Sequence, residues 1–171
     1  MKYNNLLGTI RRKIDHVQII WAVICYPHRK VGKLNIVGPL EFFEQTCNAL
    51  KLLQEKCPDA FKKIELYLET ILFYKRSGIF STLSKPLCMV SKKSAYHSLV
   101  WYASGLAHES YHVYLYRTKA NDMSDQEEER LCLEYEATIL IRLGADESMI
   151  AYIKKAGEKR HWEVPPWKQD W

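Results

Sequence analysis

The chain has 171 residues, 47% hydrophobic and 26% charged, a composition typical of a folded protein and not of a disordered one. The formal net charge of +5 is modest and the basic residues are scattered, so we expect no nucleic-acid groove. This length fits one domain, and the low counts of glycine and proline, 7 and 6, predict that most of the chain is helical.

The five cysteines indicate a reducing compartment. Their number is odd, no two of them are spaced C-x-x-C, and most lie among apolar residues, where cysteine acts as a small hydrophobic side chain. We therefore predict a cytoplasmic protein without a disulfide framework. The most apolar run, residues 17–26, is too short to cross a bilayer, so no membrane span is expected.

The first part of the chain, residues 1–71, is predicted to form a helical scaffold. A helix is expected over about 9–24 and a short strand over 35–37. Apolar residues at helical spacing then predict an amphipathic helix over 39–56, and Pro58 is expected to begin the next helix, because proline is tolerated in a first helical turn.

Residues 72–92 change in character. They are rich in β-forming side chains and are interrupted by Ser77-Gly78 and Lys85-Pro86, which predicts two short strands joined by a turn. Two roles are open for this hairpin. It could present an exposed edge strand to an extended peptide, or it could simply cover the core.

The motif H-E-x-x-H, His108 to His112, lies within a helix predicted over about 95–117, with Ser94 as its N-cap. Residues four apart lie on the same face of a helix, so the two histidines can offer their imidazoles to one metal ion, with Glu109 beside them. Two buried histidines with no metal are the alternative. The position of the motif, in an apolar helix followed by an acid-rich one, favours a metal site.

The acid-rich helix is predicted over 125–143. Ser124 and Glu127 have the spacing of a capping box, Gly144 is the expected terminator, and Asp146 is expected to cap a last short helix. Besides these caps, the helix offers a third ligand to the metal. Its acidic residues are Asp125, Glu127, Glu128, Glu129, Glu134 and Glu136.

Helical projection, at about 100° per residue, separates these acids. Glu129, Cys132 and Glu136 point to one side of the helix, whereas Arg130 and Glu134 lie on the other side at the spacing of an ion pair. An acid on the inward face needs a partner, which makes Glu129 the first choice as metal ligand. Glu136 is expected to accept a histidine N–H.

A glutamate on the helix after H-E-x-x-H resembles the gluzincin zinc metallopeptidases, especially their smallest members, the minigluzincins. The resemblance covers about residues 72–143. It implies that His108, His112 and Glu129 bind Zn²⁺ and that Glu109 is the general base of peptide-bond hydrolysis.

Two parts of the family pattern leave alternatives. Many of these peptidases have E-x-x-A at the third ligand, and Glu134 to Ala137 fits that pattern, so Glu134 competes with Glu129. The family also usually supports the oxyanion with a tyrosine or histidine. No motif identifies that residue here, and His97, Tyr116 and His161 are the candidates.

The fold class we predict is α+β and predominantly α-helical: a small metallopeptidase-like domain with a short β-hairpin before the H-E-x-x-H helix. The scaffold of 1–71 would be followed by a zinc-site core over 72–157. A tail over 158–171, with three tryptophans and two prolines, would dock on the body of the domain and either complete its core or lie along the cleft.

The predicted function is a zinc-dependent hydrolase, a peptidase whose partner is a peptide or protein substrate. The alternative is a non-catalytic or regulatory module with a structural metal site, in which Cys132 would be the fourth ligand. Glu109 favours the enzyme, because a structural site has no use for a general base.

Overall fold

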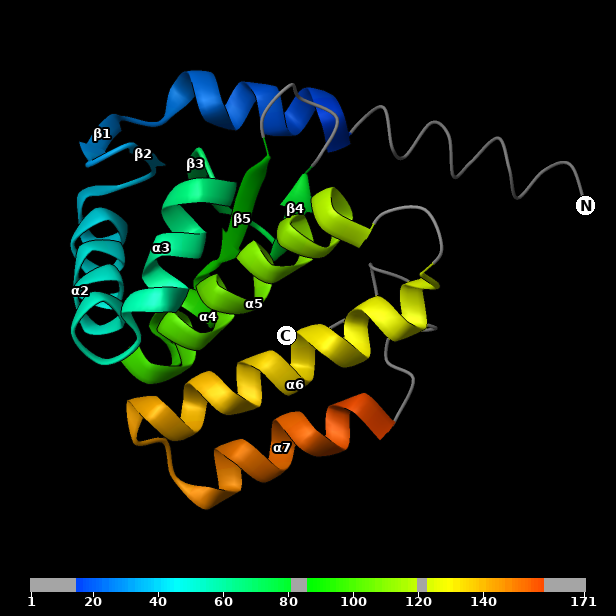
Figure 1. Cartoon of the computed structure of the whole chain (residues 1–171). Coiled ribbons are helices and arrows are strands. Elements are labelled where there is room, and N and C mark those ends of the chain that lie inside the picture. The colour runs from blue at the N-terminus through cyan, green and yellow to red at the C-terminus, as the bar shows by residue number, and fades with distance from the viewer. Residues whose placement is uncertain (1–14, 81–85, 120–122, 159–171) are drawn as a thin grey trace, which may run out of the picture.

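The computed structural model describes residues 15–80, 86–119 and 123–158 (Figure 1). Helices hold most of these residues, and five strands form one mixed sheet. The prediction of a predominantly helical chain with a small β component is therefore confirmed.

The sheet has the strand order β1-β2-β3-β5-β4. Its strands are β1 (His28–Val31), β2 (Leu34–Val37), β3 (Thr70–Tyr74), β4 (Gly78–Phe80) and β5 (Leu87–Ser91). The central strands β2, β3 and β5 are parallel, and β1 and β4 pair with them antiparallel at the two edges. The expected strand over 35–37 lies within β2.

Two expectations about β-structure need correction. Residues 72–92 were expected to hold two strands, but β4 and β5 form the hairpin, and the end of β3, which pairs in parallel with β5, precedes it. Residues 1–71 also hold an unexpected antiparallel hairpin, β1-β2. Its tight turn is possible because Gly32 adopts a positive φ of 57°, which glycine tolerates without steric cost.

The helices pack on both faces of the sheet. They are a helix over residues 15–25, α2 (Leu40–Lys56), α3 (Pro58–Tyr67), α4 (Lys92–His97), α5 (Leu99–Lys119), α6 (Asp125–Leu143) and α7 (Glu147–Glu158). Figure 1 shows α5 between the sheet and the α6–α7 pair, and the helix over 15–25 (blue) along the opposite side of the sheet. The predicted helices over 39–56 and from Pro58 are confirmed as α2 and α3.

Alternating residues of the central strands supply the two cores. Ile71 and Cys88 face α2, α3 and α5 in the larger core, which also contains the fully buried Tyr102 and Leu106 of α5. Their neighbours in sequence, such as Leu72, face the helix over 15–25 in a smaller core. This period of two is the ordinary consequence of strand geometry and fixes α5 against one face of the sheet.

The helix predicted from about 95 to 117 is interrupted. Ser91, and not Ser94, caps the short α4, because its Oγ accepts the N–H of Ser94 at 3.1 Å. Ser98 is extended, and its Oγ accepts the N–H of Trp101 at 3.1 Å, so a second helix, α5, begins at Leu99. Two serine caps seven residues apart thus divide the segment.

The caps of the last helices are confirmed. Ser124 Oγ accepts the N–H of Glu127 at 3.2 Å at the start of α6, and Gly144 ends that helix with a φ of 79°. Asp146 Oδ1 accepts the N–H of Met149 at 2.8 Å at the start of α7. These caps set the ends of the helix that carries the expected third ligand.

The predicted division of the chain at residue 71 falls inside β3, so the scaffold and the site share one sheet. The tail expected over 158–171 lies outside the described residues, apart from the last residue of α7. In the parts of the chain that the structure describes, no helix has both the length and the apolar character needed to span a bilayer.

Candidate metal centre

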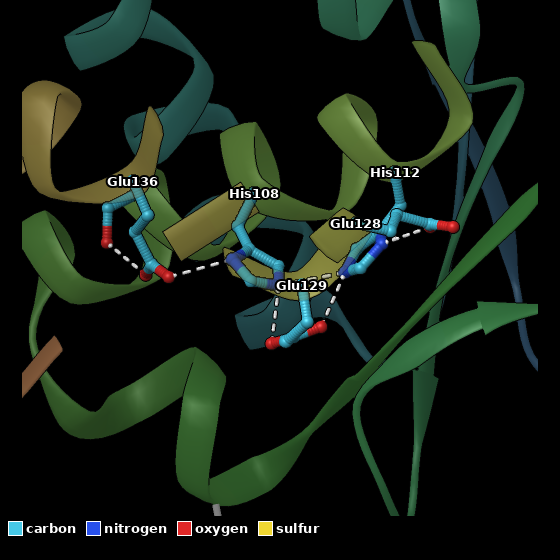
Figure 2. Close-up of polar contacts among 6 residues, drawn as sticks. His108, His112, Glu128, Glu129 and Glu136 are labelled. Atoms are coloured by element: carbon cyan, nitrogen blue, oxygen red, sulfur yellow. Dashed lines mark hydrogen bonds and ion pairs between the residues drawn. The ribbon is translucent and has the colours of Figure 1, made fainter. Parts of the chain in front are cut away.

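Two adjacent helices bring together the three residues expected to bind a metal. His108 and His112 come from successive turns of α5, and Glu129 comes from the start of α6. One donor atom from each lies within 4.8 Å of the other two. Figure 2 shows the two imidazoles and the Glu129 carboxylate turned toward one another.

The distances within this trio suit a small tetrahedral ion. The Nε2 atoms of His108 and His112 are 3.1 Å apart, and Glu129 Oε2 and Oε1 lie 3.2 Å and 3.7 Å from the Nε2 atoms of His112 and His108. Ligands about 2.0–2.1 Å from a tetrahedral zinc stand roughly 3.3–3.4 Å from one another. The donor set of two nitrogens and one carboxylate is also one that zinc prefers.

A second carboxylate lies behind each histidine (Figure 2). Glu128 Oε1 is 2.6 Å from His112 Nδ1, and Glu136 Oε2 forms an ion-pair contact of 3.0 Å with His108 Nδ1. Ser104 Oγ donates to the other oxygen of Glu136 at 3.0 Å, which fixes that carboxylate in place. An ionised carboxylate only accepts, so in a neutral imidazole the neighbouring carboxylate favours the proton on Nδ1, and Nε2 would then be available as an electron-pair donor to a metal.

The surroundings of the trio favour positive charge. Burial opposes protonation of His108, but the carboxylates of Glu136 and Glu129 outweigh it and raise the pKa of this imidazole above 6.5. Burial acts in the same direction on His112, whose pKa is nevertheless raised well above 6.5 by contacts with Cys132, Glu128 and Glu129. The trio therefore needs a cation between its donor atoms, either bound protons or a metal ion.

Glu109 lies next to this group but does not belong to it. Its side chain lines the same cavity as His108 and Glu129. Burial raises the pKa of the Glu109 carboxyl, while His108 and His112 act to lower it and Glu129 and Glu136 raise it further. A carboxylate that is more basic than usual, beside a group that could hold a metal ion, is suited to accept a proton.

A cavity of about 260 Å³ opens beside the trio. Its polar wall contains His108, Glu109, Glu129 and Glu136, and its apolar wall includes Trp101, Leu133, Tyr152 and Ile153. A mostly apolar pocket with a few convergent polar groups is the usual form of a small-ligand site. No pattern in the sequence had indicated that α7 would form one side of this cavity.

The sheet edge lies beside the cavity. Residues 88–90 of β5 line it, and β4, the outermost strand, follows Ser77, which also lines it. Among the described strands, β4 has a neighbour on one side only. In the described part of the chain, β4 is thus an edge strand that follows a residue of the cavity wall, and both roles considered for the hairpin stay open.

Other candidate residues lie elsewhere. Glu134 points to the exposed face of α6, where Arg130 Nη1 donates to its Oε1 at 2.6 Å, so it is not part of the trio. Tyr116 is exposed, and His97 contacts the ring of Trp101 but does not line the cavity. His161 lies outside the described residues.

Glu128 was one of the acidic residues of the predicted helix, but no role was predicted for it, although the sequence contains a signal for one. At about 100° per residue, Glu128, Glu129, Cys132 and Glu136 fall within one arc of roughly 100° on α6. Cys132 lies in the centre of that arc and is fully buried, and it helps to raise the pKa of His112. The projection that selected Glu129 and Glu136 could therefore have included Glu128.

The motif and the geometry of α5 and α6 are the grounds for relating this chain to the gluzincins. That relation stays a prediction, since a trio of two histidines and a glutamate does not by itself identify a family. The chain matches no protein-family model, no curated protein and no solved structure.

Proposed function

We propose that this chain is a zinc-dependent hydrolase that cleaves peptide bonds. One observation carries the proposal: two Nε2 atoms and a carboxylate converge within 4.8 Å, while a separate carboxylate lies against each Nδ1. With neutral imidazoles this arrangement would offer three electron-pair donors to one metal ion, which is the support for the proposal.

His108, His112 and Glu129 would hold the zinc, leaving one tetrahedral position for water or substrate. Zinc in such a site lowers the pKa of a coordinated water toward 7 and polarises a carbonyl group. Glu109 accepts a proton from the attacking water on a carboxylate oxygen and returns it to the leaving nitrogen. Glu128 and Glu136 hold the two imidazoles in the orientation that directs Nε2 to the metal.

Peptides are the substrate class that fits the surroundings best. The edge strand β4 offers backbone groups to an extended chain, and the cavity offers apolar walls to a side chain next to the polar groups. A peptide bound along β4 would bring one of its amide bonds toward Glu109.

The test is peptide cleavage by zinc-loaded protein, with a library of peptides as substrate. Glu109→Gln is expected to retain zinc and to lower the rate by about 10²-fold or more, the usual contribution of a general base. Glu134→Gln, a change of the same kind on the exposed face of α6, should leave the rate unchanged. Equal rates for wild type and Glu109→Gln would contradict the assignment of the base.

A regulatory module with a structural metal is the second candidate, favoured by the position of Cys132. Its side chain is fully buried on the inward face of α6, and it helps to raise the pKa of the His112 imidazole, so Cys132 is the residue that a structural site would use as a fourth ligand. Cys132→Ser separates the two functions. A structural site would lose metal affinity with this change, whereas a catalytic site with three ligands should keep its zinc and its cleavage rate.

A further inference from the structure

The helix over residues 15–25 is apolar on two opposite faces. One face packs on the sheet, where Ile19 is fully buried against the smaller core. The other face carries an outer stripe of large apolar side chains directed to solvent. Its members and their exposed fractions are Val17 66%, Ile20 40%, Trp21 67% and Ile24 69%.

The spacing of the outer stripe, i, i+3, i+4 and i+7, makes it one continuous face of the helix. A helix that is apolar all round normally has both faces covered, because water disfavours a contiguous apolar patch. Within residues 15–80, 86–119 and 123–158, the core packs against the face that carries Ile19 and leaves the outer stripe exposed. The outer stripe therefore indicates a contact with something outside the described structure.

Basic side chains line a groove along one flank of the stripe. The groove lies between Trp21 of the helix and the ends of β3 and β5. Four cations line it, and they form the basic groove: Lys75, Arg76, Lys92 and Lys93. Asp15 lies at 3.1 Å from Lys75 Nζ and 3.4 Å from Arg76 Nη2, so one carboxylate is shared by two of these cations.

We propose that the outer stripe and the basic groove together dock on a membrane surface that contains anionic phospholipids. The helix would lie in the plane of the interface, with Trp21 and Ile24 at the boundary of headgroups and acyl chains. The cations of the basic groove would face the lipid phosphates and carboxylates. This proposal is independent of the metal site and of peptide hydrolysis.

Two other occupants fit less well. A second copy of the chain, paired through a twofold axis, would bring the same four cations against one another. A nucleic acid would satisfy the basic groove but would leave the outer stripe in water. An anionic bilayer is the partner that satisfies apolar and cationic groups side by side.

Docking on this side would hold the cavity close to the bilayer. Three serines lie between the basic groove and the cavity: Ser77 and Ser94, which line the cavity, and Ser91, which lines the groove. They are joined by hydrogen bonds between Ser77 Oγ and Ser94 Oγ at 2.8 Å and between Ser91 Oγ and Ser94 Oγ at 3.0 Å. The two features are thus separated by little more than one layer of side chains.

The experiment is co-sedimentation of the full chain with vesicles of phosphatidylcholine alone or mixed with phosphatidylserine. We expect binding to the mixed vesicles, at least about tenfold weaker binding to the neutral ones, and a loss of binding as salt is raised. Tryptophan emission should shift to shorter wavelength on binding, and Trp21→Phe should reduce that shift.

Matched variants locate the contact. The double variant Trp21→Ser, Ile24→Ser should lower the affinity for mixed vesicles by about tenfold or more, and Lys92→Glu by severalfold. Leu66→Ser and Lys51→Glu change exposed residues of α3 and α2 and should have no effect. Circular dichroism and thermal unfolding establish that each variant is folded.

Three outcomes would overturn the proposal. The first is no sedimentation of the wild type with mixed vesicles. The second is equal sedimentation of wild type and the folded double variant. The third is a different occupant: a dimer in sedimentation velocity that the double variant dissociates, or an oligonucleotide that binds through Lys92, in either case without vesicle binding.

Discussion

Glu136 supports the site through His108 and does not reach the Nε2 side of the ring. It is buried, accepts from Ser104, and lies against His108 Nδ1. Glu136→Gln removes the negative charge and keeps the shape of the side chain. We expect zinc affinity to fall by about 10- to 100-fold, the usual cost of losing a carboxylate behind a metal-bound histidine. Competition with a chromogenic chelator measures this affinity.

Glu134→Gln is the control for that prediction. Glu134 is on the same helix but on its exposed side, paired with Arg130. Its replacement should leave zinc affinity unchanged. If Glu134→Gln weakened zinc binding as much as Glu136→Gln, Glu134 would again be a candidate for the third zinc ligand. The proposed role of Glu136, which is to orient His108, would then be refuted.

Side chains on the inward face of α6 were predictable to different degrees. Glu129 was selected by helical projection, and the structure brings it to His108 and His112. Glu136 was expected to accept a histidine N–H, and it lies 3.0 Å from His108 Nδ1. Glu128 was missed because its place beside His112 depends on how far α6 is rotated against α5, a property of tertiary packing that sequence spacing does not fix.

Gly105 lies in the middle of α5, one turn before His108, and lines the cavity. The presence of small residues at this point predicts space for a ligand or another element. A Cβ at Gly105 would meet no atom within 4 Å. Gly105→Ala should therefore raise the free energy of unfolding by about 0.5–1 kcal/mol, because alanine favours the helix. Urea denaturation of the metal-free protein gives this value.

Gly38→Ala supplies the opposite case. A Cβ there would lie 2.6 Å from Phe42 Cδ1 and 2.8 Å from Phe73 Cβ, so the substitution must displace packed side chains. We expect it to lower the stability by about 1–3 kcal/mol, the range for overpacking. A Gly105→Ala variant as unstable as Gly38→Ala would show that the space beside α5 is not open.

Arg142 of α6 donates two hydrogen bonds to the carboxylate of Asp59 in α3, from Nη1 to Oδ2 at 3.0 Å and from Nη2 to Oδ1 at 2.5 Å. Chiefly through this contact, the pKa of Asp59 is lowered from 3.8 to about 2. A lowered folded-state pKa gives stability that is fully present above the unfolded value of 3.8 and is lost as the pH falls through about 2. Both side chains of this ion pair are partly exposed, so screening by solvent limits its contribution to the free energy of unfolding to roughly 0.5–1 kcal/mol.

Asp59→Asn should therefore be less stable than the wild type at pH 7 and nearly equal to it at pH 2. Urea unfolding at several pH values measures the difference, and the Arg142→Gln background should abolish it. A difference that stays constant from pH 7 to pH 2 would show that Asp59 acts through something other than its charge.

The helix boundaries show which local sequence signals are enough to predict where a helix begins or ends. Ser124, Gly144 and Asp146 were identified because each stands alone at the end of an apolar pattern. The break between α4 and α5 was missed because three serines, at 91, 94 and 98, compete for the role of cap, and the choice among them depends on where β5 ends.

The order and pairing of the strands in the sheet could not be predicted from the sequence. A short strand at 35–37 was expected, and β-forming residues with turn signals indicated strands in 72–92. The pairing of β2 with β3 and of β3 with β5, however, joins segments separated by helices or by another strand. The cavity has the same origin. Its walls come from β5, α5, α6 and α7, and no local pattern indicates that these elements meet.

The metal content of purified protein, measured by mass spectrometry for the wild type, Glu129→Ala and Glu134→Ala, tests the proposed trio most directly. All three proteins should be folded, and the wild type and Glu134→Ala should carry about one zinc per chain, whereas Glu129→Ala should lose it. A wild type without zinc affinity, or a Glu129→Ala variant that binds zinc as tightly as the wild type, would contradict the metal centre of His108, His112 and Glu129.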